Sequence, residues 1–455
     1  MSLSVIILAA GQGSRMGAGV PKTLREVAGR PMLDWVLAAL KPLKVDRTLV
    51  MVHPNAQSVK HHLEHTHPDV ESIEQSQPLG TGHAVQEAIQ YLDDQQQVLI
   101  LLGDVPGVQS EDLQALIDQT GQGFGLLTTT VTDPNMLGRI VRDSKGQVLG
   151  VVEASEASLS EKNICEINTG VCLAPVHFLK QALPHIKPHA SKGEYYLLDV
   201  LPQWLAEHST LQVWHASGGD SLCGVNTPLE CSRISRILQI RQAERWIQAG
   251  VHIEDVHRIN IRGNVKVESG AWIDANVVLS GDTSIASGAR VGFGSYLFNT
   301  QVGPDVLIHP YSVCESVQLN RSAQVGPYAV IRSSKVGEST QLGSFVEVKR
   351  SDIGQSVKAK HLSYLGDAVI ASQVNIGAGV ITCNYDGANK HTTVIQAGAF
   401  VGAAVQLIAP VTVGKGAFVA AGATLRADAP EDCLTIEPRS KLKYVKRWKR
   451  PKKQP

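Results

Sequence analysis

Aliphatic residues recur every six positions through much of the second half of the chain. Two unbroken series show the spacing: Val267, Ile273, Leu279, Ile285, Val291 and Leu297, and then Val401, Leu407, Val413, Val419 and Leu425. A six-residue period fits neither the 3.6-residue period of a helix nor the two-residue alternation of a strand. It is typical of a parallel β-helix, in which each coil has three short strands and each strand points one aliphatic residue inward. An ordinary β meander with chance spacing is the alternative.

The first half of the chain alternates between strand and helix patterns. Strands are predicted at 3–8, 48–52 and 98–102, and helices at 31–40 and 81–92. This alternation predicts a doubly wound parallel sheet. Ligands of such sheets bind beyond the carboxyl ends of the strands. Gly11 and Asp104 each follow a strand, so we expect both at that edge.

A glycine-rich turn, residues 9–16, follows the first strand directly. Such a turn lets backbone N–H groups approach a phosphate chain. Met16 stands where the dinucleotide fingerprint needs its third Gly, which disfavours an NAD site. Arg15 and Lys22 supply cations for a phosphate-bearing ligand. A simple turn with a solvated rim is the alternative for this loop. Asp104 fits a ligand of a divalent cation or a turn-forming Asp close before Pro106.

A capping box with Pro at the first helical position, Thr227-Pro228-Leu229-Glu230, begins a helical pattern that Gly250 can end. It predicts one long helix over residues 228–249 that joins two domains. A helix packed wholly within the first domain is the alternative. The predicted organisation is a first domain at 1–226, a linker helix at 227–250 and a second domain at 251–455.

The six-residue repeat is interrupted between Ile376 and Ile395, which lie 19 positions apart rather than 18. The interval contains a polar, aromatic-bearing stretch at 382–390, and such excursions are more often functional than structural. His361 lies in a dense polar stretch just before it. Imidazole is the side chain that takes up a proton near neutral pH, as general-base catalysis requires. The neighbouring polar residues favour a catalytic over a structural histidine.

The net charge of zero is unevenly distributed along the 455 residues. Residues 441–455 carry eight Lys or Arg and no acid, so residues 1–440 sum to −8. Without a second basic patch, we interpret this tail as a mobile segment near the phosphates of a ligand or as a solvated tail, rather than as a nucleic-acid-binding element. Seven scattered cysteines and no secretory leader favour a reduced, cytoplasmic setting. No apolar run is long enough for a membrane span.

A histidine-rich segment at 61–67 places His61 and His65 one helical turn apart, as metal ligands can be. No Cys or acid motif supports a metal site there. We therefore expect a solvated surface helix.

The segment Leu8–Met16 together with Pro21-Lys22 resembles the signature of sugar-phosphate nucleotidyltransferases. With the repeats added, nearly the whole chain resembles the family of bacterial bifunctional N-acetylglucosamine-1-phosphate uridyltransferases and glucosamine-1-phosphate N-acetyltransferases. Further matching segments are Gln75, 79–84, 103–106, 138–140, 152–153, 166–170, 193–196 and 224–226. The resemblance implies an α/β, Rossmann-like nucleotidyltransferase domain, a long linker helix and a left-handed parallel β-helix of hexapeptide repeats.

The resemblance also implies roles for residues of the first half. Those implied for UTP and the UDP-sugar are Leu8, Ala9, Ala10, Gly11, Lys22, Gln75, Gly80, Thr81, Leu102, Gly103, Asp104, Gly138, Glu153, Asn168 and Asn226. Asp104 and Asn226 would bind Mg²⁺. Lys22 and Arg15 would stabilise the charge that develops on the phosphates. Such chemistry needs positioning and positive charge rather than a covalent nucleophile.

In the second half the resemblance implies His361 as the general base, Glu347 as the group that orients it, and Asn384 as the group that steadies the oxyanion. Residues implied for glucosamine-1-phosphate are Arg332, Lys349, Tyr364 and Asn375, and those for acetyl-CoA are Ala378, Asn384, Tyr385, Ala403, Ala421 and Arg439. The chain departs from the family pattern twice. Ala403 replaces a Ser, and Arg439 stands one step out of register.

The resulting hypothesis is a bifunctional enzyme of UDP-N-acetylglucosamine biosynthesis that feeds peptidoglycan and lipopolysaccharide synthesis. It would act on small molecules as a homotrimer, with no nucleic-acid or membrane partner. One alternative is a single-activity nucleotidyltransferase whose β-helix serves only assembly. A non-catalytic scaffold is another, but it predicts eroded phosphate and metal positions, whereas Lys22 and Asp104 are present.

Overall fold

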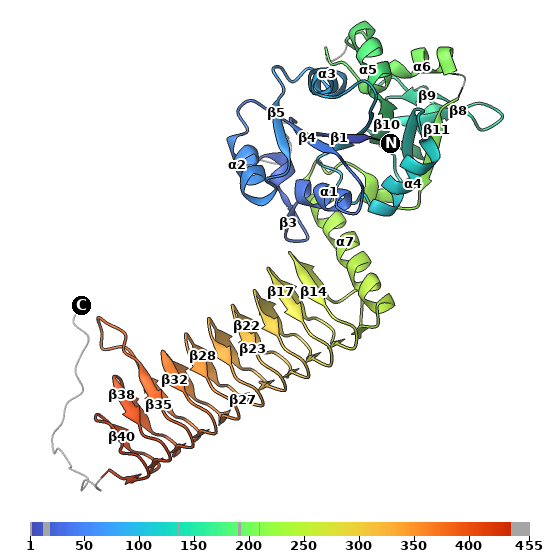
Figure 1. Ribbon diagram of the computed structural model, residues 1–455. Helices are drawn as coiled ribbons and strands as arrows, with labels where there is room; N and C mark the ends of the chain where they lie inside the picture. The colour runs from blue at the N-terminus through green and yellow to red at the C-terminus, as the bar shows by residue number, and fades with distance from the viewer. Residues whose placement is uncertain (1, 12–18, 135, 190–192, 209, 438–455) are drawn as a thin grey trace, which may run out of the picture. The chain divides into compact units, whose positions relative to one another are not determined.

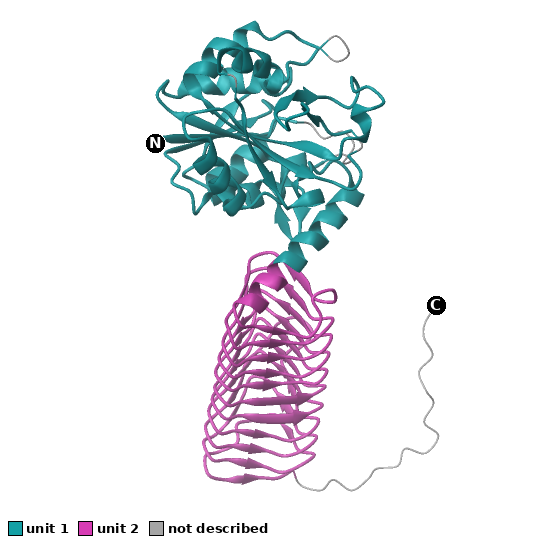
Figure 2. Cartoon of the chain, turned by 90° about the vertical axis from the view of Figure 1, so that its right-hand side faces the viewer, with its two compact units in different colours: residues 1–241 teal, residues 242–455 magenta. Residues whose placement is uncertain are grey.

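The structure is a computed structural model that describes residues 2–11, 19–134, 136–189, 193–208 and 210–437. Arg15, Arg439 and the basic tail lie outside the described residues. The chain divides into two compact units, residues 1–241 and 242–455 (Figure 2). The division falls within α7 (Pro228–Gln248), which matches the predicted helix 228–249 to within one residue. The predicted domain limits at 226 and 250 stay a prediction.

Unit 1 is built on a twisted, mostly parallel sheet (Figure 1). Its main path runs in the order β11 (Gln212–Ala216), β7 (Gly125–Thr130), β10 (Glu166–Pro175), β6 (Gln97–Leu102), β1 (Leu3–Leu8), β4 (Arg47–Val52) and β5 (Glu71–Glu74). β10 runs antiparallel to both of its neighbours, which the predicted parallel sheet did not include. The hairpin of β8 (Arg139–Arg142) and β9 (Val148–Val152) leads into β10, so no crossover helix sets its direction.

Successive side chains of each strand point to opposite faces of this sheet, and both faces are buried. Val5 and Ile7 of β1 pack into one core cluster and Ile6 packs into another. The first cluster takes side chains from α1 (Met32–Leu40), α2 (Gln57–Thr66) and α4 (Ser110–Thr120), and the second from α3 (Thr81–Ala88), α5 (Val176–Ala182) and α6 (Leu201–His208). The predicted helix 81–92 is α3 followed by a 3-10 turn, η3 (Ile89–Tyr91). This is the doubly wound arrangement that the sequence predicts.

Unit 2 is a left-handed parallel β-helix, a prism with three sheets (Figure 2). Every third strand joins the same sheet, except that the last strand, β41, pairs with β39. The first sheet runs from β12 (His252–Ile253) to β41 (Leu434–Thr435), the second from β13 (Asn260–Arg262) to β40 (Thr424–Leu425), and the third from β14 (Val265–Val267) to β38 (Val411–Val413). The aliphatic residues of both predicted series are buried, except Val267, which is partly buried against the same core.

Strand register explains the phase slips in the six-residue spacing. Val278 of β16 (Val278–Ser280) pairs with Tyr296, 18 positions later, but Tyr296 of β19 (Tyr296–Phe298) pairs with Val313, only 17 later. A coil of 17 residues has one corner shortened by one residue, so one of its steps is five instead of six. The inward positions stay stacked while their spacing in the sequence shifts.

One coil is longer than the others around it. Ile353 of β29 (Asp352–Ile353) pairs with Ile370, 17 positions later, whereas Ile370 of β32 (Ala368–Ile370) pairs with Ile395, 25 positions later. The eight extra residues lie in the nine-residue loop 384–392 between β34 (Ile381–Cys383) and β35 (Thr393–Ile395). The predicted interruption is confirmed. Among the described residues, no helix is long and apolar enough to cross a membrane.

Candidate functional sites

A cavity of about 400 Å³ lies at the carboxyl ends of β1 and β6 in unit 1. Its wall contains Leu8, Ala9, Ala10, Gly11, Lys22, Gln75, Gly80, Thr81, Leu102 and Asp104, all predicted site residues, together with Thr23, Pro78, Ala84, Glu194 and Tyr196. Gly103 is not part of the wall, but its N–H donates to the Leu8 carbonyl at 2.9 Å and joins the two strand ends. The structure therefore gathers at one sheet edge residues that lie far apart in the sequence.

Gly80 closes this cavity where α3 begins. Its φ of +101° is one that side chains rarely adopt, and a Cβ there would lie 2.6 Å from the Tyr195 carbonyl oxygen. Only glycine allows the loop to pass this close. The buried Gln75 side chain donates to the Gly80 carbonyl at 3.3 Å and lies 3.3 Å from His83 Nδ1. The predicted Gln75 and Gly80 thus form one wall that helps to shape the cavity.

A second cavity of about 290 Å³ adjoins the first, and Thr81, Leu102, Asp104 and Tyr196 contribute to both walls. It is lined by the predicted Gly138, Glu153, Asn168 and Asn226, and by Met136, Leu137, Thr169, Gly170, Cys172, Leu197, Leu198, Leu222 and Gly224. A Cβ on Gly138 would lie 3.2 Å from Glu153 Oε1, so the missing side chain leaves the carboxylate accessible. Two adjoining cavities with a shared wall suit two ligands that react with each other.

The shared wall carries a compact cluster of charge. The Lys22 ammonium forms an ion pair with Asp104 Oδ2 and donates to Asn226 Oδ1 at 2.7 Å. Lys22 is only 8% exposed. The backbone around the cluster is fixed, since the Val225 N–H donates to the Asp104 carbonyl at 2.9 Å and Glu230 accepts from the Asn226 N–H at 2.5 Å. A cation is therefore already held between the two predicted metal ligands.

This donor set fits Mg²⁺. Asp104 Oδ2 and Asn226 Oδ1 both lie within hydrogen-bonding reach of the single Lys22 nitrogen, so the two oxygens converge on one point. A carboxylate and an amide oxygen are hard ligands of the kind that Mg²⁺ prefers, and it usually takes its remaining ligands from water and substrate phosphates. The roles of these residues as metal ligands stay a prediction.

Tyr196 and its neighbour His189 were not among the predicted site residues. The His189 ring packs against the Tyr196 ring with centroids 4.3 Å apart and the ring planes tilted by 39°, and it contacts Glu156 at 2.8 Å and Asp199 at 2.9 Å. The hydrogen bond to Glu156, joined by that to Asp199, raises the pKa of His189. His189 therefore links the segment after Glu153 to the segment that carries Tyr196. The matching segment Gly193-Glu194-Tyr195-Tyr196 was the feature of the sequence that could have indicated Tyr196 as a site residue.

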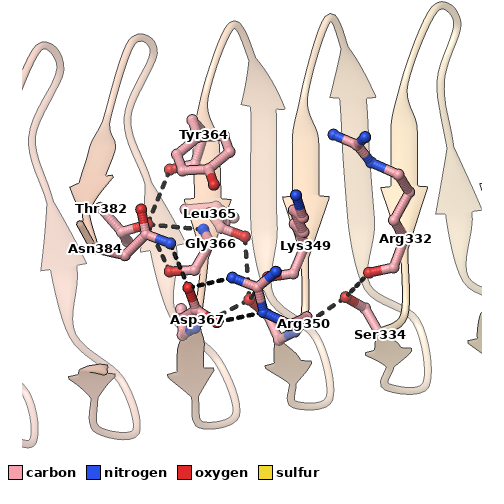
Figure 3. Close-up of polar contacts among 12 residues, drawn as sticks. Arg332, Ser334, Lys349, Arg350, Tyr364, Leu365, Gly366, Asp367, Thr382 and Asn384 are labelled. Atoms are coloured by element: carbon pink, nitrogen blue, oxygen red, sulfur yellow. Dashed lines mark hydrogen bonds and ion pairs between the residues drawn. The ribbon is translucent and has the colours of Figure 1, made fainter. Parts of the chain in front are cut away.

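Three of the four predicted sugar-phosphate residues of unit 2, Arg332, Lys349 and Tyr364, lie on the outer face of the second sheet (Figure 3). Arg332 of β25 (Val330–Arg332) pairs in register with Lys349 of β28 (Glu347–Lys349), and Glu347 pairs with Tyr364 of β31 (Tyr364–Gly366). Neighbouring strands lie about 4.8 Å apart, so two cations stand side by side on one flat surface. Asn375 of β33 (Asn375–Ile376) lies on the first sheet instead.

His361 ends β30 (Lys358–His361) at the corner between the first and second sheets, and it is exposed. The predicted coenzyme A residues follow it along that corner. The Gly379 N–H donates to the His361 carbonyl at 3.4 Å, the Ala404 N–H to Ala378 at 2.8 Å, and the Gly422 N–H to Ala403 at 2.8 Å. This corner of the prism thus carries an exposed row of residues on successive coils, in which small side chains follow the histidine: His361, Ala378, Ala403 and Ala421. Tyr385 is exposed on the inserted loop.

Within the part of the chain that the structure describes, no hydrogen bond or ion pair joins Glu347 to His361. Glu347 instead forms an ion pair with Arg332. The role of Glu347 in orienting His361 therefore stays a prediction.

Asn384 is held by a residue that sequence reasoning missed. Its side-chain amide donates to Asp367 Oδ2, and Asp367 is also bound by both Nε and Nη2 of Arg350 at 2.7 Å (Figure 3). The Arg350 hydrogen bonds, with that from Asn384, hold the pKa of Asp367 below its ordinary value. Asn384 is only 8% exposed, so its orientation depends on this carboxylate.

Asn384 and His361 lie at opposite edges of the second sheet, one where its strands begin and the other where they end. His361 precedes β31, while Asn384 hydrogen-bonds to Asp367, which follows β31. A three-residue strand of about 10 Å separates these two corners within one chain. A groove of about 730 Å³ runs along the Asp367 corner, and no predicted site residue lines it. One chain by itself does not bring together the predicted base and oxyanion residue.

Comparison with known proteins agrees with this two-part architecture. The MobA-like NTP transferase domain family matches residues 5–203, the stretch that builds most of both unit 1 cavities. Bifunctional protein GlmU of Cupriavidus taiwanensis is 42% identical over 456 residues, covering 100% of each chain. The protein of the same name from Cupriavidus necator is 43% identical over 100% of each chain, and that from Methylococcus capsulatus is 40% identical over 100% of this chain and 98% of its own.

A nucleotidyltransferase domain followed by a hexapeptide-repeat β-helix, matched along its whole length, defines a bifunctional transferase with nucleotidyltransferase and acyltransferase activities. The chain belongs to the GlmU family. The resemblance that its motifs carry is thereby confirmed, as is the bifunctional role in UDP-N-acetylglucosamine biosynthesis. The single-activity alternative is not favoured, because the relatives match across both units.

Proposed function

We propose that the two adjoining cavities of unit 1 transfer a uridylyl group from UTP to N-acetylglucosamine-1-phosphate, and that the His361 corner of unit 2 transfers the acetyl group of acetyl-CoA to glucosamine-1-phosphate. All four substrates are small molecules, and we expect the protein to act in the cytoplasm. The observation that carries the proposal for unit 1 is the Lys22, Asp104 and Asn226 cluster at the wall between the two cavities.

In unit 1, the nucleotide would lie in the cavity of Gly11 and Gln75 and the sugar in the cavity of Glu153 and Asn168. A phosphate oxygen of the sugar-1-phosphate attacks the α-phosphorus of UTP, the bond to the β-phosphate breaks, and pyrophosphate leaves. Lys22 lies at the junction, where its positive charge stabilises the charge that builds up on the phosphate oxygens. Mg²⁺ held by Asp104 and Asn226 would supply further neutralisation of the phosphates.

In unit 2, Arg332 and Lys349 would bind the phosphate of glucosamine-1-phosphate on the face of the second sheet. His361 would take a proton from the sugar ammonium, and the neutral amine would then attack the thioester carbonyl of acetyl-CoA. The tetrahedral oxyanion collapses, the carbon–sulfur bond breaks, and the leaving coenzyme A thiolate takes the excess proton from the nitrogen, so that the products are the N-acetyl sugar and the free thiol. The Asn384 amide donates to the oxyanion, and the row of alanines beside His361 leaves room for the coenzyme.

We further propose that the acetyltransferase site forms between chains of a homotrimer. His361 and Asn384 lie at opposite edges of one sheet, which supports this proposal. A neighbouring prism can supply the Asn384 side chain that the His361 corner lacks within its own chain. The test mixes two inactive variants, His361→Ala and Asn384→Ala, by denaturation and refolding. Sites that take the two residues from different chains recover up to about a quarter of the activity, whereas sites within one chain recover none.

Two single variants test the division of labour. Asp104→Ala is expected to abolish uridylyl transfer and leave acetyl transfer intact, because it removes a carboxylate from the shared wall of the unit 1 cavities alone. His361→Ala is expected to do the reverse. Pyrophosphate release and free-thiol release measure the two reactions separately. A folded variant of either kind that lost both activities would contradict the assignment.

A further inference from the structure

A group of metal-binding side chains lies in unit 1 on the helices α1 and α2, outside both cavities (Figure 1). Asp34 of α1 faces His62 of α2 and His67, the residue that follows α2. Asp34 Oδ1 lies 2.6 Å from His62 Nε2 and 3.1 Å from His67 Nε2. The sequence pattern suggests only His61 and His65 as possible metal ligands and favours a solvated surface helix; those two residues are exposed, and their ring centroids lie 3.9 Å apart.

The three side chains are mounted on well-packed elements. Leu33 and Leu37 of α1 and Leu63 of α2 are buried in the same core cluster. The backbone of His67 is held at both ends, because its N–H donates to the Leu63 carbonyl at 2.8 Å and its carbonyl accepts from Val70 at 3.0 Å. A metal ion can therefore bind with little reorganisation of the backbone, which favours affinity.

The spacing of the ligand atoms suits a tetrahedral transition-metal ion. With metal–nitrogen and metal–oxygen bonds of about 2.0–2.1 Å, tetrahedral ligand atoms lie about 3.3 Å from one another. The two observed distances to Asp34 Oδ1 fall short of this by less than about 1 Å, so small side-chain rotations suffice. The three side chains are 16–20% exposed, which leaves a coordination position open to water.

The electrostatic surroundings leave the carboxylate available. The Arg30 guanidinium lies near Asp34, but it donates to the Asp34 backbone carbonyl at 3.3 Å and rests 4.6 Å from the centre of the Trp35 ring. Among the described residues, the only donors that reach the Asp34 carboxylate are the two imidazoles. The nearest ligands are two nitrogens and one carboxylate oxygen, a set that suits Zn²⁺ and its neighbours and not the oxygen-seeking Mg²⁺.

We propose that Asp34, His62 and His67 form a second metal site, which binds a divalent transition-metal ion of the Zn²⁺ class and fastens α2 to α1. The site is separate from the oxygen-rich Mg²⁺ position predicted at Asp104 and Asn226. Because α1 and α2 cover one face of the nucleotide-binding sheet, the ion stabilises the fold of unit 1 and takes no part in the transfer reactions.

The test uses tag-free, full-length protein that has been stripped with a chelator and kept in excess Mg²⁺. Zn²⁺ is titrated against a chromophoric competitor, and Co²⁺ absorption reports tetrahedral geometry. Asp34→Asn keeps an oxygen that can accept from both imidazoles but is a poor metal ligand, and His62→Gln likewise keeps an N–H donor. The double variant His61→Gln/His65→Gln is the matched control on the same helix.

We expect the wild type and the control to bind one Zn²⁺ with equal affinity and to show tetrahedral Co²⁺ bands. Asp34→Asn and His62→Gln should each bind about 100-fold more weakly. Zn²⁺ should raise the melting temperature of the wild type and not that of Asp34→Asn, while both fold without metal. The proposal is overturned if the wild type binds no Zn²⁺ under these conditions, if Asp34→Asn and His62→Gln bind as the wild type does, or if the control loses the site.

Discussion

Replacing Asp367 should weaken acetyl transfer although this residue touches no predicted substrate atom. Asp367 has a φ of +48°, a conformation that glycine adopts without strain, so Asp367→Gly deletes the carboxylate and leaves the corner intact. The Asn384 amide then loses its charged acceptor. A hydrogen bond to a charged group contributes about 1.5–3 kcal/mol. If most of that energy holds the amide toward the oxyanion, kcat for acetyl transfer falls roughly 10–100-fold.

The assay is free-thiol release from acetyl-CoA, with pyrophosphate release measured on the same preparation. The KM for glucosamine-1-phosphate should stay within about twofold, because Arg332 and Lys349 are untouched, and uridylyl transfer should not change. Asp367→Asn keeps an acceptor oxygen and should recover part of the loss. A kcat for Asp367→Gly within about twofold of wild type would refute the positioning role.

The pH dependence of this contact follows from the lowered pKa of Asp367. A carboxyl group whose folded pKa is depressed stabilises the fold above its unfolded value of 3.8, and loses that contribution as the pH falls through the folded pKa. The stability difference between wild type and Asp367→Gly should therefore be full at neutral pH and shrink in strong acid. Denaturant unfolding across that range measures it.

Three further outcomes are expected. Gly80→Ala forces a Cβ to within 2.6 Å of the Tyr195 carbonyl at a φ of +101°, so it should destabilise unit 1 by about 1–3 kcal/mol and raise the KM for UTP; an unchanged KM in steady-state kinetics would argue against the cavity assignment. His189 has a raised pKa because of Glu156, so its contribution is full below its unfolded pKa of 6.5 and is lost as the pH rises through the folded pKa. His189→Gln should thus lower the melting temperature at pH 6 more than at pH 9, and an equal loss at both would contradict the linkage. Ile331→Ala leaves a hole in the fully buried ladder and should cost about 2–5 kcal/mol in denaturant unfolding, with a loss below 1 kcal/mol counting against tight packing of the prism.

Much of the fold could be predicted because each coil of the β-helix requires aliphatic residues at the same inward positions. An inward position flanked by corners accepts only an aliphatic side chain of suitable size, so Leu279 and Val413 reveal their burial by spacing alone. The reversed strand β10 could not be predicted in the same way. A buried strand has the same composition in either direction, and its direction follows from the hairpin before it rather than from its own residues.

The candidate sites divide in a similar manner. Gly11 and Asp104 could be placed at one edge because both follow strands, whereas Glu153 and Asn168 were suggested by family resemblance alone. Asp367 was missed because it binds Arg350 and Asn384, which lie on neighbouring coils at a corner of the prism. The six-residue spacing marks the inward positions and gives no sign of contacts at a corner.

The long coil shows that the stacked strands of the β-helix keep their pairing when residues are inserted at a corner. Eight residues enter after β34, yet Ile370 still stacks on Ile395 as though they were absent. Because each coil pairs only with its neighbours, such an insertion transmits no change to the rest of the prism. The part of the loop that follows Asn384 and Tyr385 can therefore be lengthened, shortened or exchanged for another while the supporting structure stays the same.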